Sequence, residues 1–328
     1  MKVSRIVSTG AVALAACGVL GMVSPGVQAS SASAATWTQQ APATSPPARE
    51  SASMAYDAAT GTEVLFGGQS SSSQPLHDTW TWNGSTWTQQ APATSPPARE
   101  DASMAYDAAT GTVVLFGGVS DRGRRPGGTW TWDGSAWTQQ APATSPPTRY
   151  GASMVYDAAT GTVVLFGGYD GRYLRGTWTW NGSTWTKQAP ATRPPARANA
   201  MMAYDAATGT VVLFGGTGAE GNDLGGTWTW NGSTWTKQAP ATSPPARFEA
   251  SMAYDAATGT VVLFGGAGNN QYFGDTWTWD GSTWTKQAPA TSPPARSGAS
   301  MAYDAATGTV VLFGGLASGS YDHTWTWG

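Results

Sequence analysis

Six copies of one sequence pattern fill most of this chain of 328 residues and constrain its fold more than any other feature. Each copy runs from an Arg that follows a double proline, through Tyr-Asp-Ala-Ala-Thr-Gly-Thr and Val-Leu-Phe-Gly-Gly, to Thr-Trp-Thr-Trp. The Phe-Gly-Gly triplets begin at Phe66, Phe116, Phe166, Phe214, Phe264 and Phe313, with spacings of 50, 50, 48, 50 and 49 residues. A period of this length, with several short strand-like segments in each copy, indicates that every repeat forms one small sheet.

The second repeat shows the four strands that we expect in each unit. Residues 103–106 are mostly small, as suits an innermost strand, and residues 113–116 form a continuous apolar run that suits a strand buried on both faces. Residues 129–132 alternate Thr and Trp, which places both Trp on one face. The Asp133-Gly134 pair predicts a two-residue type I′ turn into a fourth strand at residues 137–140. Six such units predict an all-β fold, a six-bladed β-propeller with four antiparallel strands per blade.

The two ends of the repeat region complement each other. The last repeat stops at residues 324–328 without an outer strand, whereas residues 37–40 form an isolated outer strand ahead of the first repeat. We therefore expect the N-terminal strand to complete the last blade and close the ring. The alternative is an open array, which would leave two apolar edges exposed. The 18 Trp, three per repeat, suit the closed ring because large flat side chains fill the space between neighbouring blades.

The first residues predict export. Lys2 and Arg5 precede an apolar run over residues 6–23, so we expect a signal peptide over residues 1–29 that is cleaved from the mature protein. The predicted location is therefore secreted or extracellular. The alternative is a lipoprotein anchored through Cys17, the only cysteine of the chain.

The rest of the chain would consist of a short linker over residues 30–36 and one propeller domain over residues 37–328. It contains no cysteine, hence no intramolecular disulfide, and no second segment apolar enough to span a membrane. Without Lys2 and Arg5, 15 basic residues remain against 20 acidic ones, and this formal charge of −5 disfavours nucleic-acid binding. We expect a monomer whose partner is an extracellular protein or glycan.

The repeated pattern resembles the kelch repeat family, which includes the central propeller of galactose oxidase. The resemblance rests on Arg-x-x-Ala-Ser-Met-x-Tyr-Asp, Val-Leu-Phe-Gly-Gly, Asp-Thr-Trp-Thr-Trp and Ser-Thr-Trp, and it covers residues 37–328. It implies the propeller fold, but the family holds oxidases, sugar mutarotases, thioglucoside-processing proteins and modules that only bind peptides or proteins. A copper oxidase of the galactose oxidase type requires two His, two Tyr and a Cys–Tyr crosslink. With only His77 and His323, and with Cys17 in the leader, we expect no copper and no other cofactor.

The repeats differ from one another at one end of each blade. The segment after Gly-Gly and the two residues after each repeated Arg vary, whereas the Asp-Ala-Ala-Thr-Gly-Thr link is identical in all six copies. In an antiparallel blade, the loop between strands two and three lies on the same face as the link that leads into strand one. The variation therefore falls on one face, and loops on a rigid scaffold commonly carry function. We predict that this face binds a ligand, the alternative being that its loops merely tolerate drift.

One sector of this face is rich in Arg and Tyr. Acidic residues occupy blades four to six, at Glu220, Asp223, Glu249, Asp275 and Asp322. We predict that an anionic protein or glycan binds over blades two and three, where cations and aromatic rings occur together. The predicted ligand-binding residues, which include three of the repeated arginines, are Arg122, Arg124, Arg125, Arg172, Tyr173, Arg175, Arg193, Tyr150, Tyr169, Arg99, Arg149 and Arg197. The alternative roles are solubility for the exposed charges and hydrogen bonding to buried carbonyl groups for the repeated arginines.

A sugar mutarotase or epimerase is the alternative function. Such a reaction needs an acid and a base that face each other across a pocket. The candidates by position are Glu50, Glu100, Asp101, Glu249 and Tyr150, although solvated charges at a rim are the simpler interpretation, and we assign no catalytic residue. A metal site built from His77 and His323 with the neighbouring Asp78 and Asp322 is a further alternative. We expect no metal, because this ligand set is minimal and nothing in the sequence fixes its distances.

Overall fold

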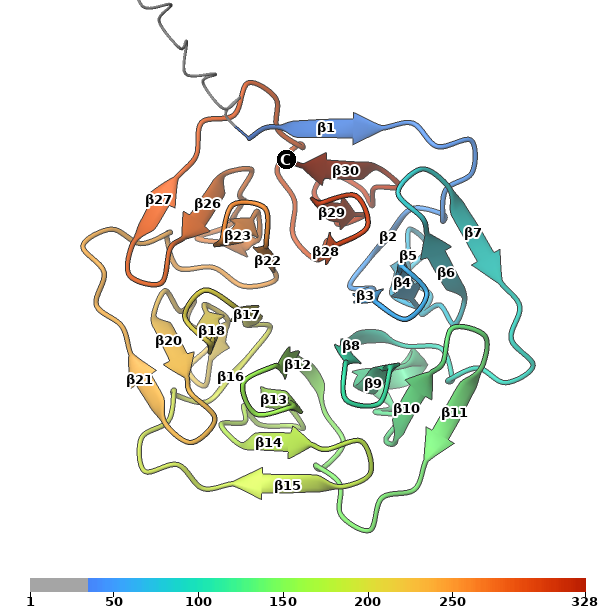
Figure 1. Cartoon of the computed structure of the whole chain (residues 1–328), viewed down its shortest axis with the longest axis horizontal. Coiled ribbons are helices and arrows are strands. Elements are labelled where there is room, and N and C mark those ends of the chain that lie inside the picture. Colours follow the sequence, from blue (N-terminus) through green and yellow to red (C-terminus); the bar gives the residue numbers. More distant parts are fainter. Residues whose placement is uncertain (1–34) are drawn as a thin grey trace, which may run out of the picture. The chain divides into compact units, whose positions relative to one another are not determined.

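The computed structural model describes residues 35–328, which fold as a six-bladed β-propeller around a central channel (Figure 1). The predicted all-β architecture with four antiparallel strands per blade is therefore confirmed. The predicted signal peptide over residues 1–29, the alternative lipid site at Cys17 and most of the linker over residues 30–36 lie outside the described residues. In residues 35–328 no helix has the length and apolar character needed to cross a membrane.

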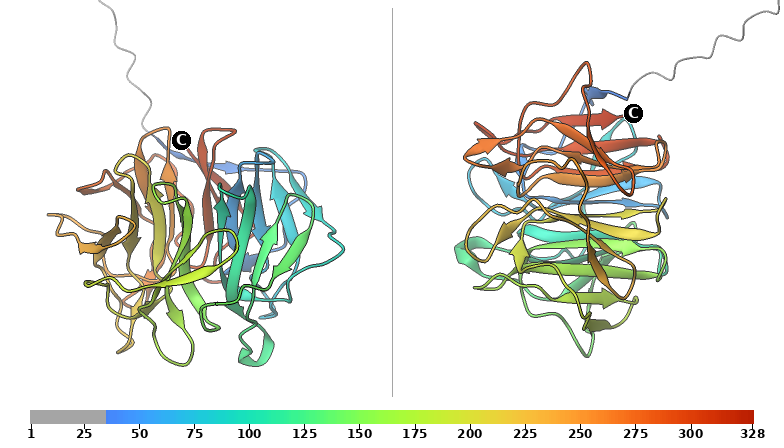
Figure 2. Two further views of the ribbon diagram at one scale, coloured as in Figure 1. Left: turned by 60° about the horizontal axis from the view of Figure 1, so that its bottom comes forward. Right: turned by 90° about the vertical axis from the view of Figure 1, so that its left-hand side faces the viewer.

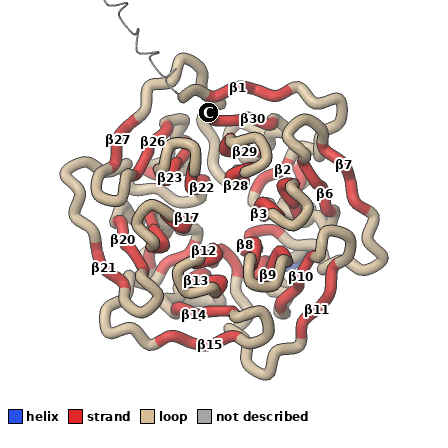
Figure 3. Tube along the Cα trace, in the orientation of Figure 1, coloured by secondary structure: helices blue, strands red, loops and turns tan. Residues whose placement is uncertain are grey.

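Each blade is one sheet whose strands follow one another from the channel outward (Figure 3). Blade one contains β3 (Ser53–Asp57), β4 (Thr62–Phe66), β6 (Thr79–Trp82) and β7 (Trp87–Gln90). Blade two contains β8 (Glu100–Asp107), β9 (Thr112–Val119), β10 (Thr129–Trp132) and β11 (Trp137–Gln140). Blade three contains β12 (Tyr150–Asp157), β13 (Thr162–Tyr169), β14 (Thr177–Trp180) and β15 (Trp185–Gln188). Blade four contains β17 (Met201–Asp205), β18 (Thr210–Phe214), β20 (Thr227–Trp230) and β21 (Trp235–Lys237). Blade five contains β22 (Ser251–Asp255), β23 (Thr260–Phe264), β26 (Thr276–Trp279) and β27 (Trp284–Lys286). Blade six contains β28 (Ser300–Asp304), β29 (Thr309–Phe313), β30 (Thr324–Trp327) and the N-terminal strand β1 (Trp37–Gln40).

Shorter elements lie in the connections between these strands. They are the pairs β2 (Arg49–Glu50) with β5 (Gln69–Ser70), β16 (Arg197–Ala198) with β19 (Thr217–Gly218), and β24 (Ala267–Gly268) with β25 (Gln271–Tyr272), and the 3₁₀ helix η1 (Asp121–Gly123). Seen from the side, the strands run across the thickness of the ring and the connections gather at its two faces (Figure 2).

The N-terminal strand closes the ring. β1 pairs antiparallel with β30, so that Trp37 lies opposite Trp327 and Gln40 lies opposite Thr324. The Trp37 indole Nε1 also donates a hydrogen bond of 2.9 Å to Oγ1 of Thr276 in blade five. The predicted completion of the sixth blade by residues 37–40 is therefore confirmed, and β1 lies beside β30 in Figure 1.

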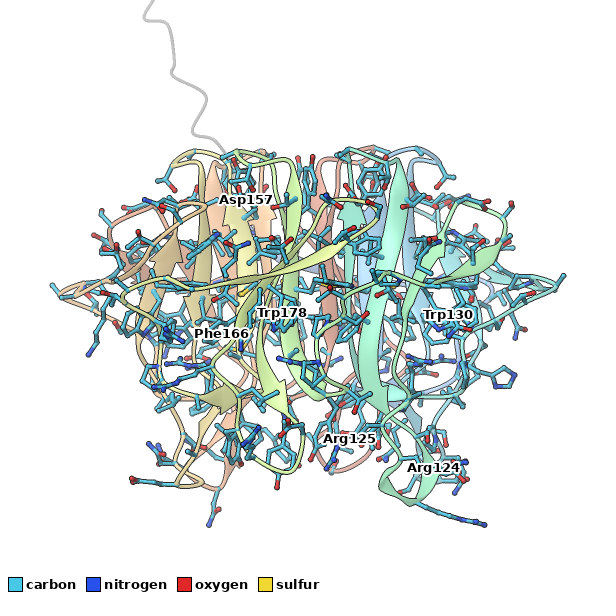
Figure 4. The ribbon with its side chains drawn as sticks, turned by 90° about the horizontal axis from the view of Figure 1, so that it is seen from below. Arg124, Arg125, Trp130, Asp157, Phe166 and Trp178 are labelled. Carbon is cyan, nitrogen blue, oxygen red and sulfur yellow. The ribbon has the colours of Figure 1, made fainter. Side chains whose placement is uncertain are left out.

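The repeated Trp and Thr residues join neighbouring blades. The indole of Trp137 in blade two donates a hydrogen bond of 2.9 Å to Oγ1 of Thr79 in blade one, and its ring lies 5.3 Å from that of Phe66. The same Trp–Thr bond joins all six pairs of adjacent blades. One Trp from the outer strand of each blade makes this bond, and the Thr that begins each third strand accepts it. Trp130, Phe166 and Trp178 are also buried, and Figure 4 labels them midway between the two faces of the propeller.

The turn between the third and fourth strands corrects one prediction from the sequence. Strand pairing in blade two ends with Trp132 opposite Trp137, so the loop has four residues and not the two that we predicted. Gly134 has a φ of +94°, but Asp133 is outside the left-handed region, so this is not a type I′ turn. Instead, Oδ1 of Asp133 accepts the N–H groups of Ser135 and of the residue after it. The side chain replaces a tighter backbone turn, which is a common use of Asp and Asn.

Candidate functional site

The two variable segments of each repeat lie on the same face, as predicted. β2 pairs with β5 in blade one, and Tyr150 lies opposite Tyr169 in blade three. Figure 4 shows Arg124 and Arg125, which belong to the blade-two loop, at the end of the ring opposite Asp157, which begins a constant turn. We call the end that holds Arg124 and Arg125 the variable face, and the opposite end the constant face.

The constant face has a structural reason for its uniform sequence. A Cβ added to Gly134 would lie only 2.6 Å from Cγ2 of Thr60 in the neighbouring blade. The same close approach recurs between other blades, for example between Gly84 and Thr307. These turns interlock, so packing alone explains why they do not vary. The difference in sequence variation between the two faces therefore does not identify a binding face by itself. A binding site has to be recognised from the side chains that the variable loops bring together.

The six repeated arginines are buried in the scaffold. Arg99 donates from Nε to the Pro97 carbonyl at 2.9 Å and from Nη1 to the Gly117 carbonyl at 2.8 Å. Its own carbonyl accepts the Gly68 N–H at 2.9 Å, and a Cβ on Gly67 would lie 2.6 Å from the same oxygen, so the Phe-Gly-Gly motif is needed for close contact between blades. At most 2% of the residue surface is exposed for the three that we predicted to bind a ligand, Arg99, Arg149 and Arg197. These three guanidinium groups therefore lie beneath the surface of the variable face.

Two of the six arginines, in the part of the chain that the structure describes, form ion pairs with a carboxylate. Arg49 makes two hydrogen bonds to Asp78, at 2.7 and 2.9 Å, and Arg247 makes two to Asp275, at 2.7 and 3.1 Å. Burial lowers the pKa of the other four guanidinium groups to about 10. These four are Arg99, Arg149, Arg197 and Arg296.

Arg125 and three of the predicted tyrosines come together between blades two and three. The guanidinium carbon of Arg125 lies 5.8 Å from the ring centroids of both Tyr150 and Tyr169, and Nη1 donates to the Asp170 carbonyl at 3.0 Å. The ring of Tyr169 lies 5.5 Å from that of Tyr150 and 5.1 Å, edge to face, from that of Tyr173. We call Arg125, Tyr150, Tyr169 and Tyr173 the Arg–Tyr patch. All four side chains are partly exposed and hold one another in place.

The remaining predicted arginines differ in their surroundings. Exposed arginines on the same two loops as the patch are Arg122, Arg124, Arg172 and Arg175. Arg124 donates to Asp121 at 2.8 Å, and Arg172 lies 3.7 Å from Asp170, so that part of the positive charge is offset. Arg193 is exposed in the link between β15 and β16, where it donates to a backbone carbonyl of that link at 3.3 Å. Figure 4 places Arg124 beside Arg125 at the variable face, and the other three exposed arginines lie on the same two loops as the patch, whereas Arg193 lies on a separate link.

A ring of strained residues surrounds the channel at the variable face. The second residue after each repeated Arg has a φ between +51° and +63°. Five of these residues donate their backbone N–H to the carbonyl of the corresponding residue in the neighbouring blade, at 2.7–3.0 Å. The six residues, which we call the belt, are Ser51, Asp101, Gly151, Asn199, Glu249 and Gly298. They line a cavity of about 160 Å³, and the left-handed backbone of the non-glycine members is tolerated because these hydrogen bonds hold it.

Two acidic residues of the sugar-enzyme alternative, Asp101 and Glu249, line this cavity, whereas Glu100 lines a separate pocket between the loops of blades one and two. Burial, with the charges of Asp101 and Glu50, raises the pKa of Glu100 to about 7. Burial also raises the pKa of Asp101 to about 6 and that of Glu249 to about 7, and Asp101 adds to the shift at Glu249 although the two residues belong to different blades. Raised pKa values of this size suit general acid–base chemistry near neutral pH. Burial also raises the pKa of Glu50, and Tyr150, the last candidate, lies in the Arg–Tyr patch.

Two residues that position Glu249 were missed in the sequence. Nδ2 of Asn199 donates to Oε1 of Glu249 at 2.9 Å, and Oγ of Ser297 donates to Oε2 at 3.2 Å. Both occupy the variable positions directly after a repeated Arg, and this was the available signal. The sequence does not show that side chains from blades four, five and six converge on one carboxyl group.

The histidines do not form a metal-binding cluster. Residues 35–328 contain no group of three or more His, Cys, Asp or Glu that could hold a metal ion. His323 lies 3.8 Å from Asp322 and stacks on Tyr321, with the ring centroids 5.5 Å apart.

Comparison with models of known protein families finds no match, and no curated protein matches the chain. The chain is a six-bladed β-propeller built from six sequence repeats. This conclusion rests on its strand order and on the closing pair β1–β30.

Proposed function

We propose that this protein is an exported propeller of the kelch type that acts as a non-catalytic recognition module outside the cell. In this proposal residues 1–29 are a cleaved signal peptide, residues 30–36 a linker and residues 37–328 the binding domain. The repeated motifs support the kelch assignment, and the charged start followed by an apolar run supports export. Anchoring through Cys17 is the alternative to free secretion.

The observation that carries the proposal is the Arg–Tyr patch. Tyr side chains offer large contact areas at a low cost in conformational entropy, and an Arg can bind a carboxylate or sulfate with two hydrogen bonds. In the patch these groups are already in contact, so a ligand finds them in place. An anionic partner, either an acidic protein segment or an acidic glycan, fits both the cations and the rings.

The charge on the rest of the variable face supports this orientation. Arg122 and Arg172, beside the patch, have 89% and 83% of their side chains exposed. The loops of blades four to six carry Glu220, Asp223 and Asp322 instead. An approaching anion is therefore attracted toward blades two and three and repelled by the opposite sector.

Binding of two anionic probes, poly-glutamate and heparin, tests this proposal. The triple variant Arg124→Glu, Arg125→Glu, Arg172→Glu should weaken binding at least about tenfold and flatten its dependence on NaCl concentration. The matched control reverses the same number of charges on outer strands, at Lys187, Lys237 and Lys286, and should change affinity by less than about threefold. Equal losses in both variants, or unchanged affinity in the first, would refute the assignment, with melting curves verifying that each variant is folded.

A sugar mutarotase or epimerase is the second candidate, and the acids at the channel mouth favour it. Asp101 and Glu249 line one cavity, and their pKa values of about 6 and about 7 would let one group donate a proton while the other accepts one. Anomer exchange measured by NMR over a panel of free sugars tests this activity. Saturable acceleration that disappears in Asp101→Asn and Glu249→Gln, but persists in Glu220→Gln on an exposed loop, would support the enzyme. No acceleration with any sugar would exclude it for that panel.

A further inference from the structure

A cleft of about 580 Å³ opens on the variable face over blades four to six, on different blades from the Arg–Tyr patch. This volume falls within the range of about 300–1,000 Å³ that is usual for small-molecule sites. One side is the hairpin β24–β25 of blade five. Another is formed by Ser297 and Leu316, whose backbones exchange hydrogen bonds of 3.0 and 2.8 Å, and Phe248 and Glu249 also line the cleft.

The β24–β25 hairpin is held in one conformation. Asn269 and Asn270 have φ values of +50° and +58°, which is the left-handed pair of a tight two-residue hairpin turn. The N–H of Asn269 donates to Oδ2 of Asp223, on the loop of blade four, at 3.0 Å. At the base of the hairpin, Phe248 and Ala267 exchange two backbone hydrogen bonds of 2.9 Å. A ligand in the cleft therefore meets a preformed wall and does not have to order it.

The side chains of this hairpin combine an aromatic ring with amides. Tyr272 is 41% exposed and stands out as the exposed large hydrophobic residue of the described part of the chain. The amides of Asn269, Asn270 and Gln271 are exposed beside it, and each offers both donors and an acceptor. A pyranose has the complementary surface, because one face of its ring presents C–H groups and its rim carries hydroxyls that donate and accept.

The charge of the cleft selects among sugars. No Lys or Arg lines it, whereas Asp223 and Glu249 do. An anionic sugar would have no cation to pair with and would be repelled by the carboxylate of Asp223. The ligand that fits is therefore uncharged.

We propose that the cleft over blades four to six binds an uncharged pyranose unit of a glycan. Tyr272 stacks on the apolar face of the sugar ring, and Gln271 with Asn270 bonds the hydroxyls at its rim. Asp223 acts as a positioning residue that holds the hairpin. This site is separate from the anion-binding function proposed above, because it uses other blades and a ligand of different charge.

Saturation-transfer NMR and calorimetry with glucose, galactose, mannose, N-acetylglucosamine and their disaccharides test the site. At least one of these sugars should bind saturably, and Tyr272→Ala should weaken that binding about tenfold, as loss of a stacking face implies. Gln271→Ala should weaken it as well. The matched control is Gln74→Ala, which removes an exposed amide from the loop of blade one and should leave sugar affinity unchanged.

Two results would overturn the proposal. One is that none of these sugars binds saturably at concentrations up to about 50 mM. The other is binding that survives both Tyr272→Ala and Gln271→Ala in proteins whose melting temperatures match that of the wild type. Binding of poly-glutamate and heparin tests the Arg–Tyr patch independently of the sugar site. Their affinity should fall in Tyr173→Ala and stay unchanged in Tyr272→Ala, so failure of one proposal is distinguishable from failure of the other.

Discussion

Replacing Glu63 with Val should stabilise the propeller. Glu63 lies on β4 at a position where the other five blades have Val113, Val163, Val211, Val261 and Val310. Its residue surface is 0% exposed, and neither carboxyl oxygen has a hydrogen-bond partner. Leu65, on the same face of the strand, packs against Val311 and Phe313, so Glu63 lies at the closing interface between blades one and six.

The size of the effect follows from this burial. Burial, with the charge of Asp304, raises the pKa of Glu63 well above the ordinary 4.5. The folded protein thus keeps a proton that the unfolded chain releases as the pH rises, and each pH unit of this difference costs about 1.4 kcal/mol of stability. A buried hydroxyl without a partner costs about 1–3 kcal/mol more. We expect Glu63→Val to raise the free energy of unfolding by about 4–6 kcal/mol near pH 7, or the melting temperature by roughly 6–10 °C for a domain of this size.

Thermal and urea unfolding of the wild type, Glu63→Val and Glu63→Gln, measured between about pH 5 and about pH 8, tests this expectation. The advantage of Glu63→Val should grow as the pH rises and shrink toward pH 5. Glu63→Gln should remove the pH dependence but keep the cost of a buried polar group. Val113→Glu places the same carboxyl in blade two and should destabilise it. A Glu63→Val protein no more stable than the wild type near neutral pH, or one whose advantage is independent of pH, would refute the reasoning.

Three further predictions concern the scaffold. Gly176→Asp should raise the free energy of unfolding by about 1–2 kcal/mol, because a carboxylate at this position can reach Arg149 as Asp78 reaches Arg49 in blade one. As a control, Gly128→Asp should lower stability, because the backbone φ of +98° at Gly128 disfavours any residue with a side chain. Deleting residues 35–40 should cost several kcal/mol, since it removes the buried outer strand of blade six, and an unchanged melting temperature would contradict ring closure. Metal analysis should find no stoichiometric copper, and sugar alcohols should not be oxidised.

The sequence predicts the scaffold well because its constraints are local and repeated. Only one blade lacks an outer strand of its own, so the strand at residues 37–40 has a single place to pair. The Thr-Trp-Thr-Trp segments reveal which face is buried because Trp and Thr alternate. The turn at Asp133 was predicted wrongly because the Asp-Gly pair alone does not reveal that the side chain caps the next two N–H groups. Local pairs predict a turn, but they do not determine its length.

The candidate sites were less accessible to prediction because they depend on contacts between blades. The approach of Arg125 to Tyr150 and Tyr169 joins residues of two blades, and no pattern within one repeat encodes it. Likewise, the hydrogen bond from Asn269 to Asp223 joins loops whose sequences share almost nothing with each other or with the remaining repeats. Arg99 shows the opposite error, because its presence in every repeat reflects bonds to buried carbonyls of the scaffold.

Hydrogen–deuterium exchange of the wild-type protein, with and without a bound anionic glycan such as heparin, tests whether the loops of blades two and three form the binding surface. We expect the glycan to protect the loops over residues 119–128 and 169–176 and to leave exchange in the interlocked turns of the constant face unchanged. Protection centred on the constant face or on the loops of blades four to six, or binding without protection of either loop, would contradict this expectation.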